Sequence, residues 1–565
     1  MRYLILLLLV ISSTFLVCSS ESEEPSAQIT QIVDGEDWWL PSYVKITPFS
    51  GYIAGGDWVR DRMKLKRFQD GNIHLAYHSR ASWRAINPAE DVYNWELLDK
   101  MFGDRSPNPN SGIVFYVQAY SNARKTPDLP DWVVEKGNVK FLANGTVAAW
   151  EPGCGYQKYY GKMIKAIGQR YKDHPRLVAV GMRGLDPLYG EWCWRGGEKI
   201  IQEAEARTGL TPETLRAWGI QYVKDYLEAF KGYEDRLVWQ NGEETFISSR
   251  GTNNDYGPAS RDIWRFAYDN GCGGRDGMPT VWYRYLNDGF GEKITEDRYL
   301  EFDDNFPPVK NGTMWYTENT EYWREDETWY KDKDRFGPAS YNGIRWFITT
   351  MRVLQMRRNW MNIGAKVIGE LEASNPDFLR WVEFSMGKTP QTSPDAWCWL
   401  REGYLASWNN FQPIKNFERW LLQRDVEPDG VTVPVEKLDI SMLKYNYASG
   451  KGYEFHARRT DQATGNRYIY FRSAPNFISN GPHKVLLKVT YRDGLKTEWC
   501  LEYTGAKGVS KSESVMTKGS GKWKTVTFEI PDIRFSGAFR DMDFRIALLG
   551  SVDVTVKLVR LIKLP

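Results

Sequence analysis

The sequence has almost no excess of charge of either sign. Its 74 lysines and arginines face 72 aspartates and glutamates, which leaves a formal net charge of +2. A nucleic-acid-binding protein needs a concentration of positive charge against the phosphate backbone, and the overall composition gives no sign of one. We therefore expect no nucleic-acid partner, and an anionic ligand would have to be met by a local group of basic side chains.

Cysteine and histidine are also scarce. The five histidines are scattered along the chain, and the six cysteines form no CxxC pair, so the sequence predicts no zinc site, no other metal centre and no cofactor. A structural calcium ion remains an open alternative. Five cysteines follow the N-terminal segment, an odd number that leaves at least one thiol unpaired in an oxidising compartment without fixing any pairing: Cys154, Cys193, Cys272, Cys398 and Cys500.

Long hydrophobic runs are absent beyond the first twenty residues, so no membrane span is expected. The opening "MRYLILLLLVISSTFLVCSS" joins an early arginine to an apolar run and then to small residues, which predicts a signal peptide over residues 1–20 and a secreted or periplasmic protein. Cys18 leaves a lipoprotein as an alternative, although Phe15, Leu16 and Val17 lack the small side chains that lipidation signals favour.

Aromatic residues, in contrast, are abundant. They make up 15% of the chain, with 25 tryptophans and 32 tyrosines. Such rings stack on the C–H faces of sugars and leave the hydroxyl groups free for hydrogen bonds, so the excess favours a carbohydrate site. A tryptophan-rich core is the alternative for any single ring.

Short apolar runs alternate with amphipathic stretches between residues 40 and 420, which predicts an α/β protein with a (β/α)₈ TIM barrel. We assign the barrel to residues 30–425. The last part, 432–565, alternates apolar and polar residues and predicts a C-terminal antiparallel β-sandwich, an accessory domain that either binds carbohydrate or braces the barrel. The eight expected barrel strands are 50–59, 72–80, 112–120, 176–184, 236–242, 279–286, 313–318 and 360–368.

Two glutamates follow strands on opposite sides of the expected barrel. Glu191 lies in "GLDPLYGEW" after the fourth strand, and Glu318 closes the seventh. Since loops at the carboxyl ends of the strands form one face, both carboxylates can reach a common cleft. Aromatic neighbours such as Trp192 would desolvate Glu191 and raise its pKa, while Thr317 and Asn319 would keep Glu318 ionised. A neutral and an ionised carboxyl group are what glycoside hydrolysis requires.

Three further segments resemble the clan of retaining (β/α)₈ glycoside hydrolases that includes barrel β-galactosidases and algal-polysaccharide hydrolases. They are "SWRAINPAEDVYNWELLDKMF" (82–102), "LPDWV" (129–133) and "TENTEYW" (317–323). The resemblance implies Glu191 as acid/base and Glu318 as nucleophile, with a β-linked, galactose-containing algal glycan as the first choice of substrate. Many clan members have asparagine before the acid/base, whereas this chain has Gly190, so inversion remains open.

Other side chains should line the same face as candidates for substrate binding. Arg80, Arg84 and Arg284 would also suit a sulfated or uronic sugar. Glu321 competes with Glu318 as the nucleophile. The substrate-binding candidates are His78, Arg80, Trp83, Gln118, Trp192, Asn241, Tyr283, Glu321 and Trp397.

The sequence thus predicts a secreted glycoside hydrolase of a polysaccharide or oligosaccharide. A carbohydrate-binding barrel without catalysis and an inverting hydrolase with the same two glutamates remain the alternatives. A lyase is disfavoured, because it would need a His, Tyr or Lys base beside a neutralised uronate. The sequence does not fix the oligomeric state.

Overall fold

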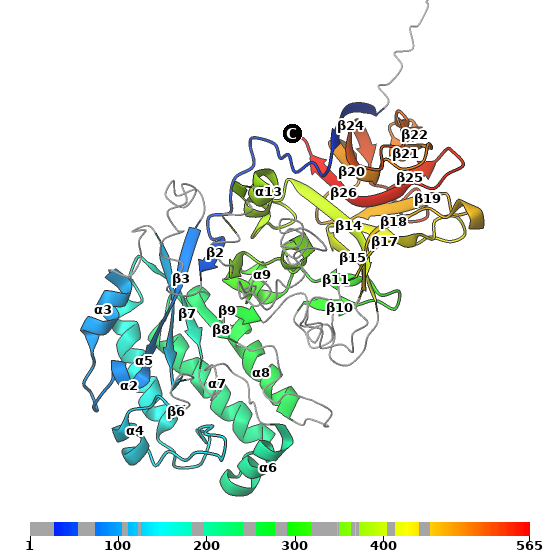
Figure 1. Cartoon of the computed structure of the whole chain (residues 1–565). Helices are drawn as coiled ribbons and strands as arrows, with labels where there is room; N and C mark the ends of the chain where they lie inside the picture. Colours follow the sequence, from blue (N-terminus) through cyan, green and yellow to red (C-terminus); the bar gives the residue numbers. More distant parts are fainter. Residues whose placement is uncertain are drawn as a thin grey trace, which may run out of the picture.

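A computed structural model of the 565-residue chain defines the fold. The residues that the structure describes are 27–54, 74–103, 111–121, 126–183, 197–240, 256–276, 291–318, 347–348, 350–362, 368, 372–373, 375–403, 413–439 and 453–565. They form a barrel surrounded by helices and, beside it, two antiparallel sheets (Figure 1).

Eight parallel strands close into a barrel, which confirms the predicted (β/α)₈ architecture. Each strand pairs with the next one along the chain, and β13 pairs with β2 to close the ring. In order, the strands are β2 (Gly51–Ala54), β3 (His74–Ser82), β4 (Gly112–Gln118), β7 (Leu177–Met182), β8 (Leu237–Gln240), β9 (Gly273–Asp276), β12 (Trp315–Glu318) and β13 (Trp360–Asn362).

The sixth barrel strand is not the expected segment 279–286, most of whose residues are apolar or aromatic. It is β9, with the sequence "GGRD", and residues 279–286 lie outside the described part of the chain. Close packing explains the unusual composition. A Cβ on Gly273 would come within 2.0 Å of the backbone oxygen of Met314, and one on Gly274 would meet the ring of Trp315. Only glycine fits at these two positions, so the strand carries no apolar run.

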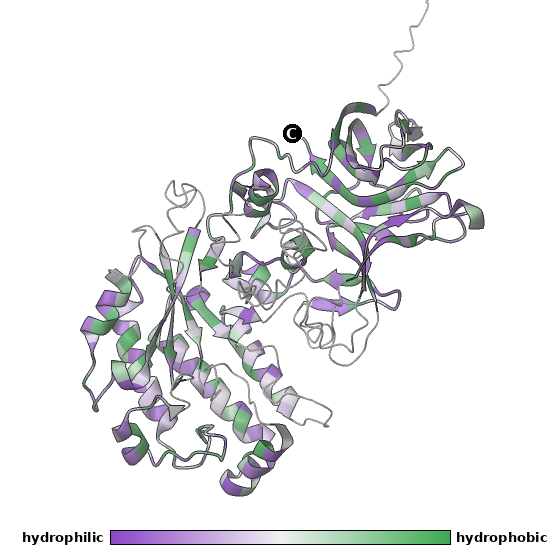
Figure 2. Ribbon diagram, in the orientation of Figure 1, coloured by the Kyte–Doolittle hydropathy of each residue, from purple (hydrophilic) through white to green (hydrophobic). Residues whose placement is uncertain are grey.

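Side chains inside the barrel form an apolar layer that includes Ile53, Ala76, Val114, Val238 and Trp360. Residues of the opposite strand faces pack outward against the helices in a much larger core. This arrangement follows from the period of two along a strand, which sends alternate side chains inward and outward. In Figure 2, the helices around the barrel carry both hydrophobic and hydrophilic residues, as expected for helices with one face on a sheet.

The helices follow the strands. The long helix α7 begins at the cap residue Thr211, whose side chain accepts a hydrogen bond from the backbone of Thr214. The helices with described bounds are α2 (Trp83–Ile86), α3 (Trp95–Gly103), α4 (Asp131–Lys136), α5 (Tyr156–Tyr171), α6 (Gly197–Thr208), α7 (Pro212–Ala229), α8 (Tyr256–Asp269), α9 (Pro307–Lys310) and α13 (Pro376–Ser385).

The antiparallel part consists of an eight-stranded and a six-stranded sheet, in agreement with the expected sandwich. The first contains β1 (Gln28–Asp34), β14 (Asp395–Gly403), β15 (Ile414–Arg419), β17 (Val433–Asp439), β18 (Tyr453–Arg459), β20 (Pro482–Arg492), β24 (Trp523–Arg534) and β26 (Thr555–Lys563). The second contains β16 (Leu421–Arg424), β19 (Tyr468–Ser473), β21 (Glu498–Gly505), β22 (Gly508–Lys511), β23 (Val515–Met516) and β25 (Phe544–Leu548).

The two sheets begin earlier in the chain than residue 432. Strands β14, β15 and β16 precede that residue, and β1, near the start of the chain, pairs with β24. The expected barrel range of 30–425 therefore contains three strands of the antiparallel sheets, β14, β15 and β16, and most of a fourth, β1. Strand β14 is buried throughout because it has cores on both sides: Trp397 and Trp399 pack with the barrel core, and Cys398 and Leu400 pack inside the sandwich.

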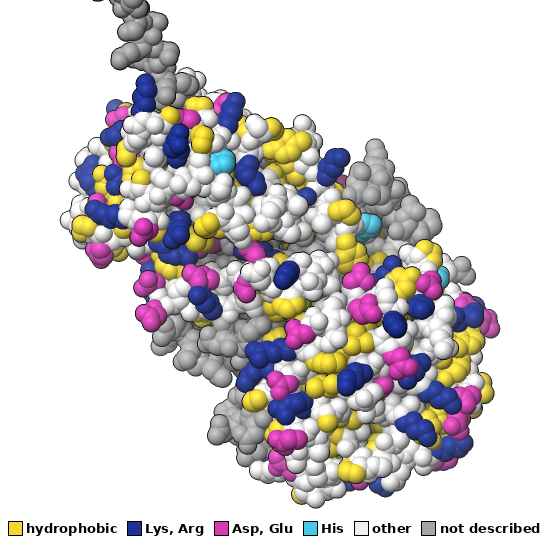
Figure 3. Space-filling model, turned by 180° about the vertical axis from the view of Figure 1, so that it is seen from behind, with side chains coloured by type: hydrophobic (Ala, Val, Ile, Leu, Met, Phe, Trp, Pro, Cys, Tyr) yellow, Lys and Arg dark blue, Asp and Glu magenta, His cyan; other side chains and the backbone are white. Residues whose placement is uncertain are grey.

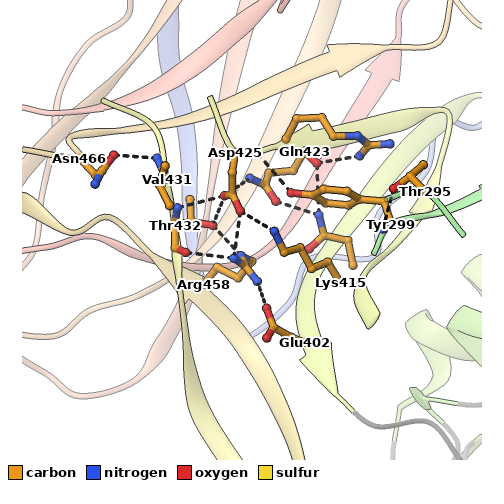
Figure 4. A network of polar contacts seen from close by, with 12 residues as sticks. Thr295, Tyr299, Glu402, Lys415, Gln423, Asp425, Val431, Thr432, Arg458 and Asn466 are labelled. Atoms are coloured by element: carbon orange, nitrogen blue, oxygen red, sulfur yellow. Dashed lines mark hydrogen bonds and ion pairs between the residues drawn. The ribbon is translucent and has the colours of Figure 1, made fainter. Parts of the chain in front are cut away.

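A hairpin between the sixth and seventh barrel strands rests against the sandwich. It consists of β10 (Glu292–Ile294) and β11 (Leu300–Phe302), and Tyr299 between them bridges to Lys415 of β15. Figure 4 shows Asp425 at the centre of this contact. Its backbone N–H donates to the phenol oxygen of Tyr299 at 3.2 Å, and its carboxylate accepts from Lys415 at 2.8 Å. The sandwich thus holds the segment that connects two barrel strands.

Two further two-residue strands, β5 (Tyr120–Ser121) and β6 (Thr126–Pro127), pair after the third barrel strand. Among the described residues, no helix combines the length and the apolar character needed to cross a membrane.

Candidate active site

Polar side chains gather at the carboxyl ends of the barrel strands, the end at which barrel enzymes bind their ligands. Glu318 is the last residue of β12, the seventh strand, and pairs in register with Asn362 of β13. Glu191 would follow β7, the fourth strand, but lies outside the described residues. Glu318 therefore ends the seventh strand, as the sequence predicts, and its role as nucleophile stays a prediction.

Five residues form what we call the mouth cluster, immediately beyond the apolar layer. They come from five different strands or strand ends: His78 on β3, Tyr116 on β4, Arg183 directly after β7, Arg275 on β9 and Tyr316 on β12.

Aromatic contacts connect the mouth cluster across the barrel. The guanidinium carbon of Arg183 lies 3.7 Å from the ring centroid of Tyr116, a cation–π contact. The Tyr116 ring meets His78 edge to face at 6.1 Å, and Nε2 of His78 lies 3.4 Å from the phenol oxygen of Tyr316. Four members of the cluster are buried: Tyr116, Arg183, Arg275 and Tyr316. The cluster therefore fills the centre of the barrel below the level of Glu318.

Electrostatics keep the imidazole of His78 neutral. Desolvation is the largest cause, followed by the positive charges of Arg183, Arg275 and Arg80, and together they hold the pKa of His78 well below its ordinary value. At neutral pH this imidazole therefore carries one N–H donor and one acceptor nitrogen. It can orient hydroxyl groups but adds no charge to a site that already contains three arginines.

Asn362 ends the eighth strand beside Glu318. It is 2% exposed, and its Oδ1 has no hydrogen-bond partner. An amide oxygen buried without a donor is costly, so it is suited to accept a hydroxyl group of a bound ligand. No sequence pattern distinguishes Asn362 as a site residue, and the same is true of Tyr116, Arg275 and Tyr316.

Two predicted candidates lie at the mouth. Arg80 is two residues beyond His78 on β3, its Cα pairs with that of Tyr116, and it is exposed. Gln118 is the last residue of β4 and is partly buried. Arg84 does not join them, because it lies on α2 and forms an ion pair of 2.8 Å with Asp131.

Two predicted tryptophans belong to the core instead of the site. Trp83 is 0% exposed and packs edge to face on Tyr156 and Tyr160, outside the barrel strands. Trp397 is also 0% exposed and packs on Trp381. Neither ring has a free face on which a sugar could stack. The prediction that these two tryptophans bind substrate is therefore wrong, and both rings stabilise the core.

The remaining candidates, Trp192, Asn241, Tyr283 and Glu321, lie outside the described residues, as does Arg284. The described residues contain no group of three or more His, Cys, Asp or Glu side chains that could hold a metal ion. Four cysteines in this part of the chain are free thiols: Cys154, Cys272, Cys398 and Cys500. On the face seen in Figure 3, basic and acidic side chains are interspersed, in keeping with the balanced composition.

Comparisons with known proteins find sequence similarity to two β-galactosidases. No protein-family model matches the sequence. The chain is 23% identical over 174 residues to the β-galactosidase LacZ of Heyndrickxia coagulans and 24% identical over 226 residues to that of Lactobacillus acidophilus. These alignments cover 29% and 36% of this chain but only 25% and 32% of the relatives, so the chain matches about a quarter to a third of their length.

Solved structures of sugar-processing enzymes are also similar, at low scores. The catalytic domain of a β-amylase from Paenibacillus polymyxa has a TM-score of 0.39 at 9% identity, over 60% of this chain and 99% of that one. An exo-β-1,4-mannosidase from Opitutaceae bacterium strain TAV5 has a TM-score of 0.32 at 10% identity, over 60% of this chain and 59% of that one. The sequence similarity to β-galactosidases confirms the resemblance inferred from the short segments.

Proposed function

We propose that the protein is a glycoside hydrolase that cleaves a β-linked, galactose-containing glycan with retention of configuration. Glu191 protonates the leaving oxygen and later removes a proton from water, and Glu318 attacks the anomeric carbon to form a glycosyl-enzyme intermediate. The observation that carries this proposal is the position of Glu318 as the last residue of the seventh strand in a closed barrel.

The chemistry of the mouth cluster supports these roles. A nucleophilic carboxylate must stay ionised, and the positive charge of Arg275, on the strand next to β12, favours the ionised form of a carboxyl group at this end of the barrel. The acid/base needs the opposite environment, and the aromatic residues next to Glu191 in the sequence, Tyr189 and Trp192, would provide it.

The neutral imidazole of His78 and the amide of Asn362 supply hydrogen-bond partners for sugar hydroxyls. Both can be used without bringing a further charge into the site. The similarity to β-galactosidases supports galactose as the sugar, and the N-terminal segment 1–20 supports action outside the cytoplasm.

Hydrolysis assays on galactose-containing polysaccharides and oligosaccharides test the proposal. The release of reducing ends is measured for the wild type, Glu191→Gln and Glu318→Gln, with Glu96→Gln on the outer helix α3 as the control. Each site variant should lose at least about a hundredfold in kcat, whereas the control should match the wild type. NMR of the first product reports its anomeric configuration. Wild-type rates in both site variants would remove the assignment, and an inverted product would remove the nucleophile role.

A further inference from the structure

Tyrosine hydroxyl groups from two helices converge on one backbone carbonyl at the end of the fourth barrel strand. The carbonyl belongs to Arg183, the residue that follows β7. It accepts a hydrogen bond from the hydroxyl group of Tyr160 on α5 at 3.1 Å and another from that of Tyr222 on α7. Two donors fill both lone pairs of this oxygen, whereas a carbonyl in a parallel ladder accepts from a single backbone N–H.

A third phenol completes the arrangement, which we call the tyrosine anchor: Tyr160, Tyr222 and Tyr226. The hydroxyl oxygen of Tyr226, on α7, lies 2.9 Å from that of Tyr160 and 3.5 Å from that of Tyr222. Because each phenol has one proton and two of the protons are used on Arg183, Tyr226 is the donor toward its neighbours. Burial raises the pKa of all three phenols, so they stay neutral donors at neutral pH and well above it.

Close packing holds the rings of the anchor in place. Tyr160 stacks on Tyr222 at a centroid distance of 5.3 Å, so α5 and α7, which lie side by side in Figure 1, meet through these side chains. Trp83 packs edge to face on Tyr160, and Trp218 stacks on Tyr222. Each phenol of the anchor is 1% exposed. Phenylalanine would fill the same space without burying a hydroxyl group, so packing alone does not account for the tyrosines.

Arg183 connects the anchor with the mouth cluster. Its guanidinium group lies over the ring of Tyr116, which in turn meets His78 edge to face. In the sequence, Arg183 also directly precedes residues 184–196, the segment between β7 and α6 that contains Glu191. Because a peptide group is planar and turns as one unit, a carbonyl held by two donors fixes the direction in which the backbone continues.

We propose that Tyr160 and Tyr222 are positioning residues, which hold the backbone at Arg183 and thereby set the position of the acid/base. The inference rests on the proposed hydrolase function, which assigns the acid/base to Glu191. Both tyrosines belong to the core between the barrel and its helices and act through the peptide group of Arg183. Position matters for this step, because proton transfer requires the acid within hydrogen-bond distance of the leaving oxygen.

Hydrogen exchange of the resting protein tests the anchor without any substrate. The double variant of Tyr160→Phe and Tyr222→Phe keeps both rings and removes both donors. Backbone amides in 184–196 should exchange about fivefold faster or more in this variant, the factor that corresponds to one hydrogen bond, and each single variant should show a smaller change in the same direction. Unchanged exchange of 184–196 in the double variant would overturn the inference.

Tyr171→Phe is the matched control for the exchange experiment. It removes a hydroxyl group from the same helix, α5, where the phenol donates to Asp99 at 2.6 Å. Exchange of 184–196 should stay at the wild-type rate in this variant. Faster exchange in the control and the double variant alike would show a general loosening of α5 and would count against the anchor.

Leaving-group dependence then connects the anchor with the acid. A dinitrophenyl β-galactoside needs no proton on its leaving oxygen, because the phenolate is stable, whereas a phenyl β-galactoside does. The double variant should lose about tenfold or more in kcat/KM with the phenyl substrate and much less with the dinitrophenyl substrate. Glu191→Gln should show the same pattern more strongly. A purely structural loss lowers both rates by the same factor, since it only reduces the amount of folded enzyme.

Failure of the anchor and failure of the proposed function have different signatures. Equal losses with both substrates in the double variant, beside a clear leaving-group effect in Glu191→Gln, would overturn the inference and leave the hydrolase intact. A wild type that cleaves neither galactoside would count against the proposed function, and the exchange of 184–196 would still decide whether the tyrosines hold this segment.

Discussion

Nε2 of His78 lies 3.4 Å from the phenol oxygen of Tyr316, so the second and seventh strands of the barrel meet through side chains across its interior. Tyr316 is fully buried and stands two residues before Glu318 on the same strand. This contact links the imidazole that we expect to meet substrate with the strand that carries the proposed nucleophile.

Replacing Tyr316 by phenylalanine should lower activity more than stability. The ring and its packing stay, but the hydroxyl group that faces His78 is lost, and a hydrogen bond of this kind contributes about 1 kcal/mol. We expect kcat/KM to fall by up to about tenfold while the urea midpoint moves little. Steady-state kinetics and urea unfolding of the same preparation check this. A large loss of stability with unchanged kinetics would show that the contact only supports the fold.

Trp83 should behave as a core residue. It is fully buried against two tyrosines of α5, so Trp83→Ala should cost about 3–5 kcal/mol of folding free energy. Trp39, which is 49% exposed, is the matched control, and its replacement by alanine should cost about 1 kcal/mol or less. Urea unfolding measures both. If Trp83→Ala instead folded normally and raised KM for the substrate, the residue would belong to the site after all.

Buried histidines should make the protein less stable in mild acid. Burial is the main cause that lowers the pKa of His78 and of His456, that of His456 to about 3. The unfolded chain takes up protons on these side chains below pH 6.5 or so, whereas the folded chain resists, so stability falls as the pH drops from about 6.5 toward the folded-state values.

The slope of the unfolding free energy against pH identifies the contribution of one side chain. Between its unfolded-state and folded-state pKa values, each such histidine should lower the unfolding free energy by about 1.4 kcal/mol per pH unit as the pH falls. Urea unfolding at pH 8, 6 and 5 measures the slope, and His456→Leu, whose site is remote from the barrel mouth, should reduce it by the equivalent of one proton. An identical pH dependence in the variant and the wild type would contradict this account.

The barrel could be predicted from the sequence where its strands are apolar. Segments such as "GIVFYVQ" and "LVAVGM" can be recognised as strands because they consist almost entirely of apolar residues. The sixth strand, "GGRD", could not be recognised, because the close approach of Met314 and Trp315 excludes the side chains that identify a strand. Arg275 was missed with it, since its role depends on lying in that strand.

The sandwich boundary could not be predicted because it depends on pairing between distant segments. β1 pairs with β24, which lies nearly five hundred residues further along the chain. The prediction that Trp397 binds substrate is wrong because the sequence of this segment does not reveal that β14 has a core on each side. The mouth cluster could be predicted only in part, for a similar reason. The position of His78 near the end of a predicted strand makes it a candidate, whereas Tyr116 and Tyr316 belong to the cluster because they contact His78 from other strands.

The contact centred on Asp425 should stabilise the barrel and the sandwich together. Although burial alone would raise its pKa, the charges of Arg458 and Lys415 hold it below the ordinary value. Thr432 donates to the same carboxylate through its backbone N–H at 3.0 Å and its hydroxyl group at 2.7 Å. Breaking a buried ion pair from one side leaves an uncompensated charge, so Asp425→Asn should cost about 3–5 kcal/mol.

The number of unfolding transitions shows whether the sandwich stabilises the barrel or folds independently of it. Because the barrel core continues into Trp399 and Phe417 of the sandwich sheet, we expect one cooperative transition in the wild type, by calorimetry and by tryptophan fluorescence alike. Asp425→Asn should shift that transition as a whole. Glu96→Gln, which removes an exposed pair with Lys100, should leave the transition almost unchanged, because solvent screens such a pair. Two separate transitions in the wild type, with Asp425→Asn affecting only one, would mean that the sandwich folds independently of the barrel.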